Sequence, residues 1–329
     1  MQNNKIRVGI VGGAGYTGGE LLRLLIHHPN AEITLVHSNS QAGKPVIDTH
    51  TDLIGDTDLV FTKELTTQVD VLFLCVGHGD GKKFLDANPI PHEVKIIDLS
   101  QDFRLKENSA LGNRQFMYGL PELNRERIKT AANVANPGCF ATAIQLALLP
   151  LAQNGSLPSE VHVSGITGST GAGQKLSNTS HFSWRNNNIS SYKVFGHQHL
   201  HEINESLQSL QANAQPAIRF VPYRGNFSRG ILCTTYLRSD FHLEEAQQLY
   251  REFYEGHPFT VVTDKNPDLK QVVNTNKCLL YLEKHEDQLV ITSLIDNLLK
   301  GASGQAVQNM NLLFGLEERA GLQLKAIGF

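Results

Sequence analysis

Short apolar runs, each ended by glycine or a polar turn, recur along the first part of the chain. The runs at 6–11, 31–37, 69–76 and 94–99 have the length and the branched aliphatic content of buried strands. Leucines at helical spacing in 21–25 follow the first of these runs. Strands that alternate with helices are typical of a parallel sheet that carries helices on its faces. This part is therefore predicted to be an α/β domain with a doubly wound parallel sheet.

The pattern is different in the second half of the chain. Residues 160–167 alternate between apolar and polar side chains, as in a strand with one buried face. Further strands of a mainly antiparallel sheet are predicted at 218–222, 230–237, 279–282 and 288–295. The small-residue stretch 168–174 and the asparagine-rich stretch 180–191 are predicted to be loops. Helices are expected to begin within 192–203 and to close the chain at 302–310, which together describe an α+β domain.

The composition excludes several classes of protein. A chain of 329 residues exceeds one typical core, so two domains are predicted. The net charge is −3 without a long basic run, so neither a nucleic acid nor a membrane surface is expected as a partner. We expect no signal peptide and no membrane span. Four scattered cysteines predict neither a zinc site nor disulfides, and they favour a cytoplasmic location. They are Cys75, Cys139, Cys233 and Cys278.

A glycine-rich turn joins the first predicted strand to the first helix. Gly12, Gly15 and Gly18 have the spacing that lets a backbone approach a pyrophosphate at a helix N-terminus. The alternative is a tight turn without a ligand, but the strand-to-helix context favours dinucleotide binding. Contacts to the cofactor are predicted from Gly12, Gly13, Gly15, Tyr16, Thr17 and Gly18.

The end of the second strand indicates which dinucleotide is bound. An NAD-binding protein usually has an acidic residue there, whereas this chain has Ser38-Asn39-Ser40 with Lys44 nearby. Small polar groups and a cation suit the 2′-phosphate, so NADP(H) is the predicted cofactor. Lys44 is equally well read as a solvated loop charge. Further cofactor contacts are predicted from Ser38, Gly77, His78, Gly171 and Asn297.

Cys139 is the candidate nucleophile. Pro137 and Gly138 mark a turn, and the apolar run after Cys139 predicts a buried helix that ends at Pro150. A thiol at a helix N-terminus ionises more readily because the unpaired N–H groups and the helix dipole favour an anion. The alternative is an inert cysteine in a core.

Candidate partners of the thiol lie on both sides of it in the sequence. The histidines at 197, 199 and 201 have an alternate spacing that does not suit a metal, so no metal is predicted and one histidine is expected to face Cys139. Arg104 follows the strand at 94–99 and is either an anion clamp or part of a structural ion pair. Substrate contacts are predicted from Ser100, Arg104, Asn136, Ser164, Gly165 and His199.

Several motifs resemble those of N-acetyl-gamma-glutamyl-phosphate reductases, a family related to aspartate-semialdehyde dehydrogenase. The resemblance covers nearly the whole chain and is strongest around Cys139. The matching segments are 12–18, 98–104, 118–122, 134–143, 197–199 and 300–306.

This resemblance implies both the architecture and the reaction. A Rossmann domain of residues 1–138 and 300–329 is expected to hold NADP(H), and residues 139–299 to form the catalytic and dimerisation domain of a homodimer or homotetramer. The implied reaction is the NADPH-dependent reduction of an N-acyl-gamma-glutamyl phosphate to the semialdehyde, in arginine biosynthesis. Cys139 would form a thioester, and His197 would be the general acid/base.

Two departures from the family pattern leave the acyl group open. Gln198 stands where the family has arginine between two histidines, and Gln174 stands where its substrate loop has arginine. An N-succinyl or an aminoadipyl substrate is the alternative, as is a non-catalytic protein that senses NADP. A short-chain dehydrogenase is excluded because no tyrosine has lysine four residues later. A Cys-His hydrolase would not require the glycine turn.

Overall fold

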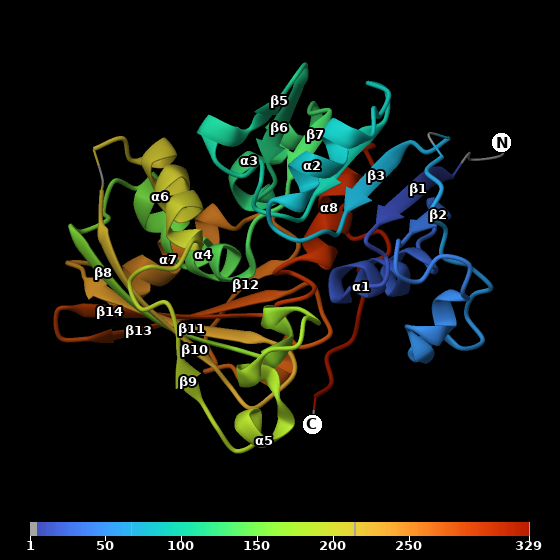
Figure 1. Ribbon diagram of the computed structural model, residues 1–329. Helices are drawn as coiled ribbons and strands as arrows, with labels where there is room; N and C mark the ends of the chain where they lie inside the picture. The colour runs from blue at the N-terminus through green and yellow to red at the C-terminus, as the bar shows by residue number, and fades with distance from the viewer. Residues whose placement is uncertain (1–4, 67, 214, 329) are drawn as a thin grey trace. The chain divides into compact units, whose positions relative to one another are not determined.

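The computed structural model describes residues 5–66, 68–213 and 215–328 (Figure 1). The chain folds into two compact units. The first contains Met1–Gly138 and Ala302–Gln323, and the second contains Cys139–Gly301 and Leu324–Phe329. None of the helices in the described residues is both long enough and apolar enough to cross a membrane.

A seven-stranded sheet with the order β2-β1-β3-β4-β7-β6-β5 forms the centre of the first unit. Its neighbouring strands pair in parallel, apart from β5 and β6, which are antiparallel. The predicted parallel sheet is therefore confirmed, although β3 and β4 are shorter than the apolar runs that contain them. The strands are β1 (Ile6–Val11), β2 (Ala31–His37), β3 (Val71–Leu74), β4 (Lys95–Asp98), β5 (Ala110–Leu111), β6 (Arg114–Tyr118) and β7 (Asn133–Ala135).

Helices cover the first sheet. The closing helix α8 packs against both α1 and α3, and its side chains are buried along its whole length. The α-helices are α1 (Tyr16–Leu25), α2 (Asp80–Ala87), α3 (Pro121–Lys129) and α8 (Ser303–Leu313). Short 3-10 turns lie at Val46–Asp48, Thr51–Leu53 and Lys106–Asn108.

The second unit contains a seven-stranded sheet with the order β12-β13-β14-β11-β8-β10-β9. The pairs β12–β13 and β8–β10 are parallel and the other four are antiparallel, so the prediction of a mainly antiparallel sheet is confirmed. The strands are β8 (Glu160–Thr167), β9 (Ser190–Ser191), β10 (Ala217–Arg224), β11 (Ile231–Arg238), β12 (Thr260–Thr263), β13 (Cys278–His285) and β14 (Gln288–Ile295).

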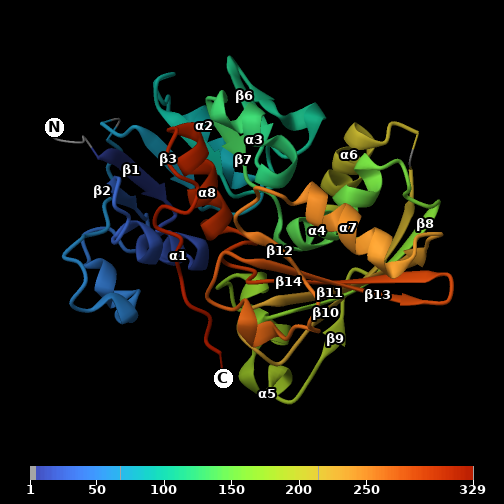
Figure 2. The same ribbon diagram turned by 180° about the vertical axis from the view of Figure 1, so that it is seen from behind.

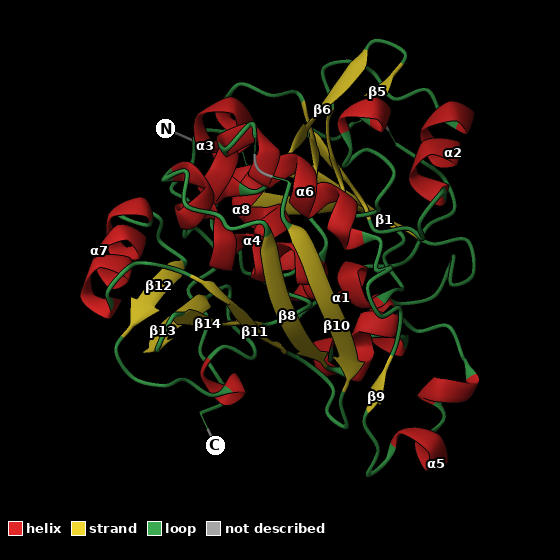
Figure 3. Ribbon diagram, turned by 90° about the vertical axis from the view of Figure 1, so that its left-hand side faces the viewer, coloured by secondary structure: helices red, strands yellow, loops and turns green. Residues whose placement is uncertain are grey.

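Helices lie on one face of this second sheet. Figures 1 and 2 show α4, α6 and α7 together on that face. They are α4 (Cys139–Gln153), α6 (His199–Leu210) and α7 (Leu243–Phe253). The predicted loop at 180–191 contains a short helix, α5 (Phe182–Arg185), because local turns there close their own hydrogen bonds, and it contains β9 because Ser190 and Ser191 pair with β10. Figure 3 shows β8 and β10 side by side beneath α4 and α6. Single 3-10 turns lie at Ser169–Ala172, Asn178–Ser180 and Leu269–Gln271.

The prediction that the helix after Cys139 ends at Pro150 is wrong, because α4 continues through Pro150 to Gln153. Proline cannot donate the hydrogen bond that the carbonyl of Leu146 would accept. The hydroxyl of Tyr254 donates to that carbonyl instead, at 2.5 Å. A buried acceptor that would otherwise cost stability is thus satisfied from another helix terminus, which lets the helix pass the proline.

The glycine turn between β1 and α1 has the backbone geometry that the sequence predicts. Gly12 has a φ of +80°, and a Cβ placed on it would lie 2.2 Å from the carbonyl oxygen of Cys75. A Cβ on Gly18 would lie 2.6 Å from the carbonyl oxygen of Gly12. Glycine is required at both positions because backbone atoms occupy the space of a side chain.

Replacing Gly12 with alanine should destabilise the fold more than the same change at Gly43. Both residues have a φ near +80°, but a Cβ on Gly43 would meet no atom within 4 Å. Gly43→Ala therefore isolates the cost of the left-handed backbone, roughly 1–2 kcal/mol. Gly12→Ala should add roughly 1–3 kcal/mol for the forced backbone shift. Urea unfolding of both variants measures the difference, and equal losses would contradict the close contact.

Candidate active site

Cys139 is the first residue of α4 and its side chain is half-buried. A Cβ placed on Gly301 would lie 2.8 Å from the Cβ of Cys139, so the chain approaches the cysteine closely there. The thiol therefore sits at a helix N-terminus, where the orphan N–H groups favour an anion. This position agrees with the expected nucleophile more closely than with an inert core cysteine.

The other cysteines are less suited to nucleophilic chemistry. All four thiols are free. Burial raises the pKa of Cys75 to about 12, and burial together with the charge of Cys139 raises that of Cys233. Cys278 is buried in β13. A thiol with a raised pKa is protonated at neutral pH and reacts slowly.

His197 lies in an aromatic cluster that begins at the residue after the cysteine. The ring of Phe140 is 5.7 Å from the imidazole, centroid to centroid. Phe220 lies 5.5 Å from the imidazole and 5.0 Å from Phe140. The side chain of His197 is only 4% exposed. The structure thus brings the predicted histidine next to the start of α4, and it favours His197 over the exposed His201.

The imidazole of His197 is neutral at physiological pH. Burial, together with the positive charges of Lys193 and Arg224, lowers its pKa to about 4. Its Nδ1 lies 3.2 Å from the backbone N–H of His199 and accepts a hydrogen bond from it. In the neutral ring the proton is therefore assigned to Nε2, which makes that nitrogen a hydrogen-bond donor.

The ring of Tyr192 contacts both the imidazole of His197 and the guanidinium of Arg224. Its ring is 5.9 Å from His197, and the Cζ of Arg224 lies 4.7 Å from the ring centroid. Burial, followed by the charge of Cys139, raises the pKa of Tyr192 to about 12, and Arg224 opposes that rise. Tyr192 and Arg224 were not predicted from the sequence. The available sequence signal for Arg224 was its position at the end of a strand, beside Gly225.

The loop at 168–173 lies next to the helix start through Asn297. The side-chain amide of Asn297 donates to Thr170 Oγ1 at 3.0 Å, and its oxygen accepts from the N–H of Gly230 at 2.7 Å. A Cβ on Gly301 would lie 2.7 Å from the carbonyl oxygen of Asn297 as well as near Cys139. Asn297 and the neighbouring Gly171 are thus placed near the cysteine, and their cofactor role stays a prediction.

The structure separates Ser164 from Gly165. A Cβ on Gly165 would lie 2.6 Å from the ring of Phe140, so this residue faces α4. Ser164 is exposed, and the alternation of β8 places it on the opposite face of the sheet. His199 is buried, with its Nε2 4.0 Å from Glu202 Oε1. Of these predicted substrate residues, Gly165 and His199 join the aromatic cluster and Ser164 does not.

The predicted substrate residues of the first unit hold strand ends together. Arg104, which is 7% exposed, donates to the carbonyls of Asn136 at 2.8 Å and Leu99 at 3.0 Å. Ser100 donates to Asp98 at 2.7 Å. The amide of Asn136 donates to the carbonyl of residue 302 at 3.1 Å. These contacts are structural, and the substrate roles of Arg104, Ser100 and Asn136 stay predictions.

Asp98 is a further group that the site predictions missed. It ends β4, its side chain is fully buried, and burial raises its pKa to about 7. Hydrogen bonds from Ser100 oppose this rise. Its place at the carboxyl end of a parallel strand, where ligands of such sheets bind, was the available signal.

The predicted cofactor residues of the first unit line the β1–α1 turn and the neighbouring strand ends. The N–H groups of Gly12 and Gly13 both donate to the carbonyl of residue 37 at 3.0 Å. A Cβ on Gly15 would meet only one atom within 4 Å, at 3.5 Å, so the first turn of α1 is accessible. The side chain of Ser38 is buried, whereas Gly77 and His78 are exposed. This open glycine turn fits a pyrophosphate.

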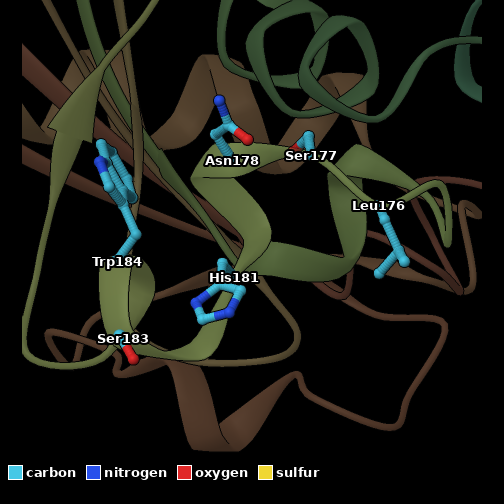
Figure 4. A pocket seen from close by; sticks show the side chains of 6 residues that line it. All are labelled: Leu176, Ser177, Asn178, His181, Ser183 and Trp184. Atoms are coloured by element: carbon cyan, nitrogen blue, oxygen red, sulfur yellow. The ribbon is translucent and has the colours of Figure 1, made fainter.

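A pocket of about 600 Å³ lies elsewhere in the second unit (Figure 4). It contains none of the predicted site residues. Its lining residues come from the segment around α5, and they are Leu176, Ser177, Asn178, His181, Ser183 and Trp184. Within the described ranges, no cluster of three histidine, cysteine or acidic side chains could hold a metal ion.

Comparison with protein families matches both parts of the chain. Residues 7–131 match the family described as "Semialdehyde dehydrogenase, NAD binding domain". Residues 139–297 match the family described as "Semialdehyde dehydrogenase, dimerisation domain".

Curated relatives match the chain over nearly its full length. A protein of Parabacteroides distasonis named N-acetyl-gamma-glutamyl-phosphate reductase is 60% identical, covering 98% of this chain and 100% of the relative. A protein of Bacteroides thetaiotaomicron with the same name is 57% identical over the same shares of the two chains.

Solved structures show the same fold at low sequence identity. Aspartate semialdehyde dehydrogenase II from Vibrio cholerae is 16% identical, with a TM-score of 0.72 over 95% of this chain and 99% of that one. Aspartate semialdehyde dehydrogenase with NADP from Candida albicans is 13% identical, with a TM-score of 0.69 over 97% and 99%.

The imidazole of His197 should titrate with a midpoint near pH 4. Because its pKa is lowered on folding, the unfolded chain binds more protons, and His197 makes the fold less stable as the pH falls below about 6.5. Histidine NMR signals followed from pH 3.5 to 8 measure the midpoint, and the His197→Asn spectrum identifies the signal by its loss. A midpoint near 6.5 would contradict the burial and the neighbouring charges.

Proposed function

Because the chain belongs to the N-acetyl-gamma-glutamyl-phosphate reductase family, we propose that it reduces an N-acyl-gamma-glutamyl phosphate to the semialdehyde and phosphate, using NADPH. The observation that carries the proposal is the position of Cys139, a half-buried thiol at the start of α4 beside the His197 cluster. This reaction belongs to arginine biosynthesis. The N-acetyl group follows the names of the relatives, and the N-succinyl group is the alternative.

The first unit has the features that NADP(H) requires. The glycine turn leaves the N-terminus of α1 open to the pyrophosphate, which the N–H groups of the first helical turn would bind, because those of Gly12, Gly13 and Gly15 already donate to backbone carbonyls. The absence of an acidic residue at Ser38, Asn39 and Ser40 leaves room for the 2′-phosphate. When bound, NADPH supplies the hydride that reduces the acyl carbon. We assign the first unit, Met1–Gly138 with Ala302–Gln323, to this nucleotide domain and the second unit to the catalytic and dimerisation domain. The sequence-based bounds of 1–138 with 300–329 and of 139–299 differ from these units only at residues 300–301 and 324–329.

Cys139 carries the acyl group through a thioester. Its sulfur forms a bond to the gamma-carbonyl carbon, and the bond from that carbon to the phosphate oxygen breaks, so phosphate leaves with the bonding electrons. A thioester accepts a hydride, whereas a carboxylate does not. After reduction the carbon–sulfur bond breaks, which releases the aldehyde and restores the thiolate of Cys139. The N-terminus of α4 stabilises that thiolate.

His197 donates a hydrogen bond to the oxygen of the reacting carbonyl. Its Nε2–H is the free donor of the neutral ring and is available to the oxyanion that develops when Cys139 attacks. Nδ1 already accepts a hydrogen bond from His199, so the neutral ring has no free nitrogen for the proton of the thiol. Cys139 therefore attacks as the thiolate that the N-terminus of α4 stabilises, and Nε2–H is the group through which His197 acts as the acid of the site. Phe140 and Phe220 hold the imidazole in place and keep water away.

The uncovered face of the second sheet suits a second copy of the chain. The residues of β8, β10, β11, β13 and β14 that point away from α4 include partly exposed apolar side chains from every strand. They are Ile166, Val221, Leu232, Tyr236, Leu279, Tyr281 and Val290. Polar residues such as His162, Ser164, Thr234 and Thr292 lie on the same face. This partly apolar face, here called the apolar sheet face, suits a homo-oligomer interface. This face supports our proposal of a homodimer or homotetramer, and the free thiols support a cytoplasmic location.

Replacing Cys139 with serine should abolish the phosphate-dependent oxidation of the semialdehyde by NADP⁺. His197→Ala should lower kcat by roughly 10²–10⁴-fold, since it removes the acid of the site. His197→Asn retains an N–H donor and should lose less. Wild-type turnover by Cys139→Ser would rule out the thioester. Side-by-side turnover of the N-acetyl and N-succinyl substrates identifies the acyl group.

A substitution that places a carboxylate on the apolar sheet face should dissociate the oligomer. Tyr236 is 39% exposed and central on that face, so Tyr236→Glu would bury an unpaired charge in the interface. Light scattering should give a multiple of 36.3 kDa for the wild type and about one chain mass for the variant. Ile54→Glu, an exposed position in the first unit, is the control. An unchanged mass for Tyr236→Glu would exclude this face as the interface.

A further inference from the structure

Two cationic side chains lie next to Tyr192 and His197, and a third lies against the backbone of one of them, all without an acidic partner. They are Arg185, Lys193 and Arg224, here called the cation cluster. Among the residues that the structure describes, none of the three forms an ion pair with a carboxylate. Elsewhere in the same unit Arg229 pairs with Asp296 at 3.0 Å. The cluster is therefore an uncompensated positive site.

Two of these cations are held by contacts that leave their charge unbalanced. Arg185 is 7% exposed and stacks 4.7 Å from the ring centre of Trp184. Its guanidinium donates to the carbonyl of Arg224 at 2.7 Å and to the carbonyl of Thr179 at 3.2 Å, so it contributes charge near Arg224 and not a free donor. The guanidinium of Arg224 stacks on Tyr192, and its Nε is buried without a hydrogen-bond partner. A buried donor of this kind costs free energy until an acceptor reaches it.

The third cation, Lys193, lies in a strained segment of backbone that hydrogen bonds to β10 keep in place. Lys193 has a φ of +47° and Phe195 has one of +57°, which are unfavourable for residues other than glycine. The N–H groups of Tyr192 and Phe195 donate to β10 carbonyls at 3.1 and 2.9 Å, which fixes the segment. The ammonium of Lys193 donates to Gln198 at 2.7 Å. The family pattern has arginine at position 198, and an arginine there would repel Lys193.

The position of the cluster indicates which anion it receives. The charge of Cys139 acts on Tyr192, the charges of Lys193 and Arg224 act on His197, and Arg224 acts on Arg185. The geometry agrees: Arg224 lies 4.7 Å from the ring centre of Tyr192, and that ring lies 5.9 Å from the imidazole of His197. The imidazole in turn lies 5.7 Å from the ring of Phe140, the residue that follows Cys139. An acyl phosphate brought to the thiol carries a dianionic phosphate and a carboxylate within a few bonds of the reacting carbon. Guanidinium groups bind both kinds of oxyanion.

We propose that Arg224, with Arg185 and Lys193, binds an oxyanion of the acyl phosphate substrate, its phosphate or its carboxylate, beside Cys139. This inference rests on the proposed function. The cation cluster would then supply the positive charge that arginines provide in the family pattern at the positions of Gln174 and Gln198. The sequence alone could not show this, because Arg185, Lys193 and Arg224 come from a short helix, a strained segment and a strand end.

Kinetics in the direction of aldehyde oxidation test the proposal, because phosphate and the semialdehyde are then separate substrates. Arg224→Gln should raise KM at least tenfold for one of them. A rise for phosphate assigns the cluster to the phosphate, and a rise for the semialdehyde assigns it to the carboxylate. Arg251→Gln, an exposed arginine of α7 paired with Asp264, should leave both values unchanged. Both KM values within twofold of wild type for Arg224→Gln would overturn the proposal.

A binding measurement tests the role of the cation cluster independently of the catalytic reaction. Calorimetric titration with inorganic phosphate and with N-acetyl-L-glutamate needs no turnover. At least one probe should bind the wild type and bind Arg224→Gln at least tenfold more weakly. Trp184 is the only tryptophan of the chain, so its emission should report the same event. Equal affinities in the two proteins, or no binding to either, would overturn the proposal even if Cys139→Ser has confirmed the reaction.

Discussion

The position of Cys139 depends on hydroxyl groups that donate to the backbone of α4. Ser293 donates to the carbonyl of residue 143 at 2.7 Å, and Tyr250 and Tyr254 donate to the carbonyls of residues 147 and 146 at 2.5 Å. The helix is apolar on every side and buried from residue 140 to 152. Apolar packing alone would tolerate a small rotation or slide, whereas directional hydrogen bonds do not. They fix the helix, and with it the sulfur at its first residue.

Local pattern was sufficient to predict most of the fold. Runs of branched aliphatic residues marked the parallel strands, and alternation marked β8 to the residue. The exception at Pro150 has a non-local cause, because Tyr254 supplies the missing hydrogen bond from 104 positions further along the chain. Sequence patterns report on neighbours within a few residues, so a partner of this kind is invisible to them.

The candidate site was predictable where a single residue type in a local context carries the chemistry. Cys139 after a turn and the glycines before α1 are of this kind. The partners of His197 were not, since Phe220, Tyr192 and Arg224 reach it from separate elements. Arg104 shows a different limit, because its position after a strand fitted both an anion clamp and a structural residue, and its bonds to two backbone carbonyls could not be read from the sequence.

The cations near the imidazole also determine when it becomes basic. In the free protein burial lowers the pKa of His197 most, and the charges of Lys193 and Arg224 lower it further. A dianion seated on those side chains cancels much of the effect of their charges, since a nearby negative charge favours the imidazolium. Proton uptake is thereby coupled to arrival of the molecule to be reduced. Between turnovers the ring stays uncharged, so the N-terminus of α4, and not an imidazolium, stabilises the anionic sulfur.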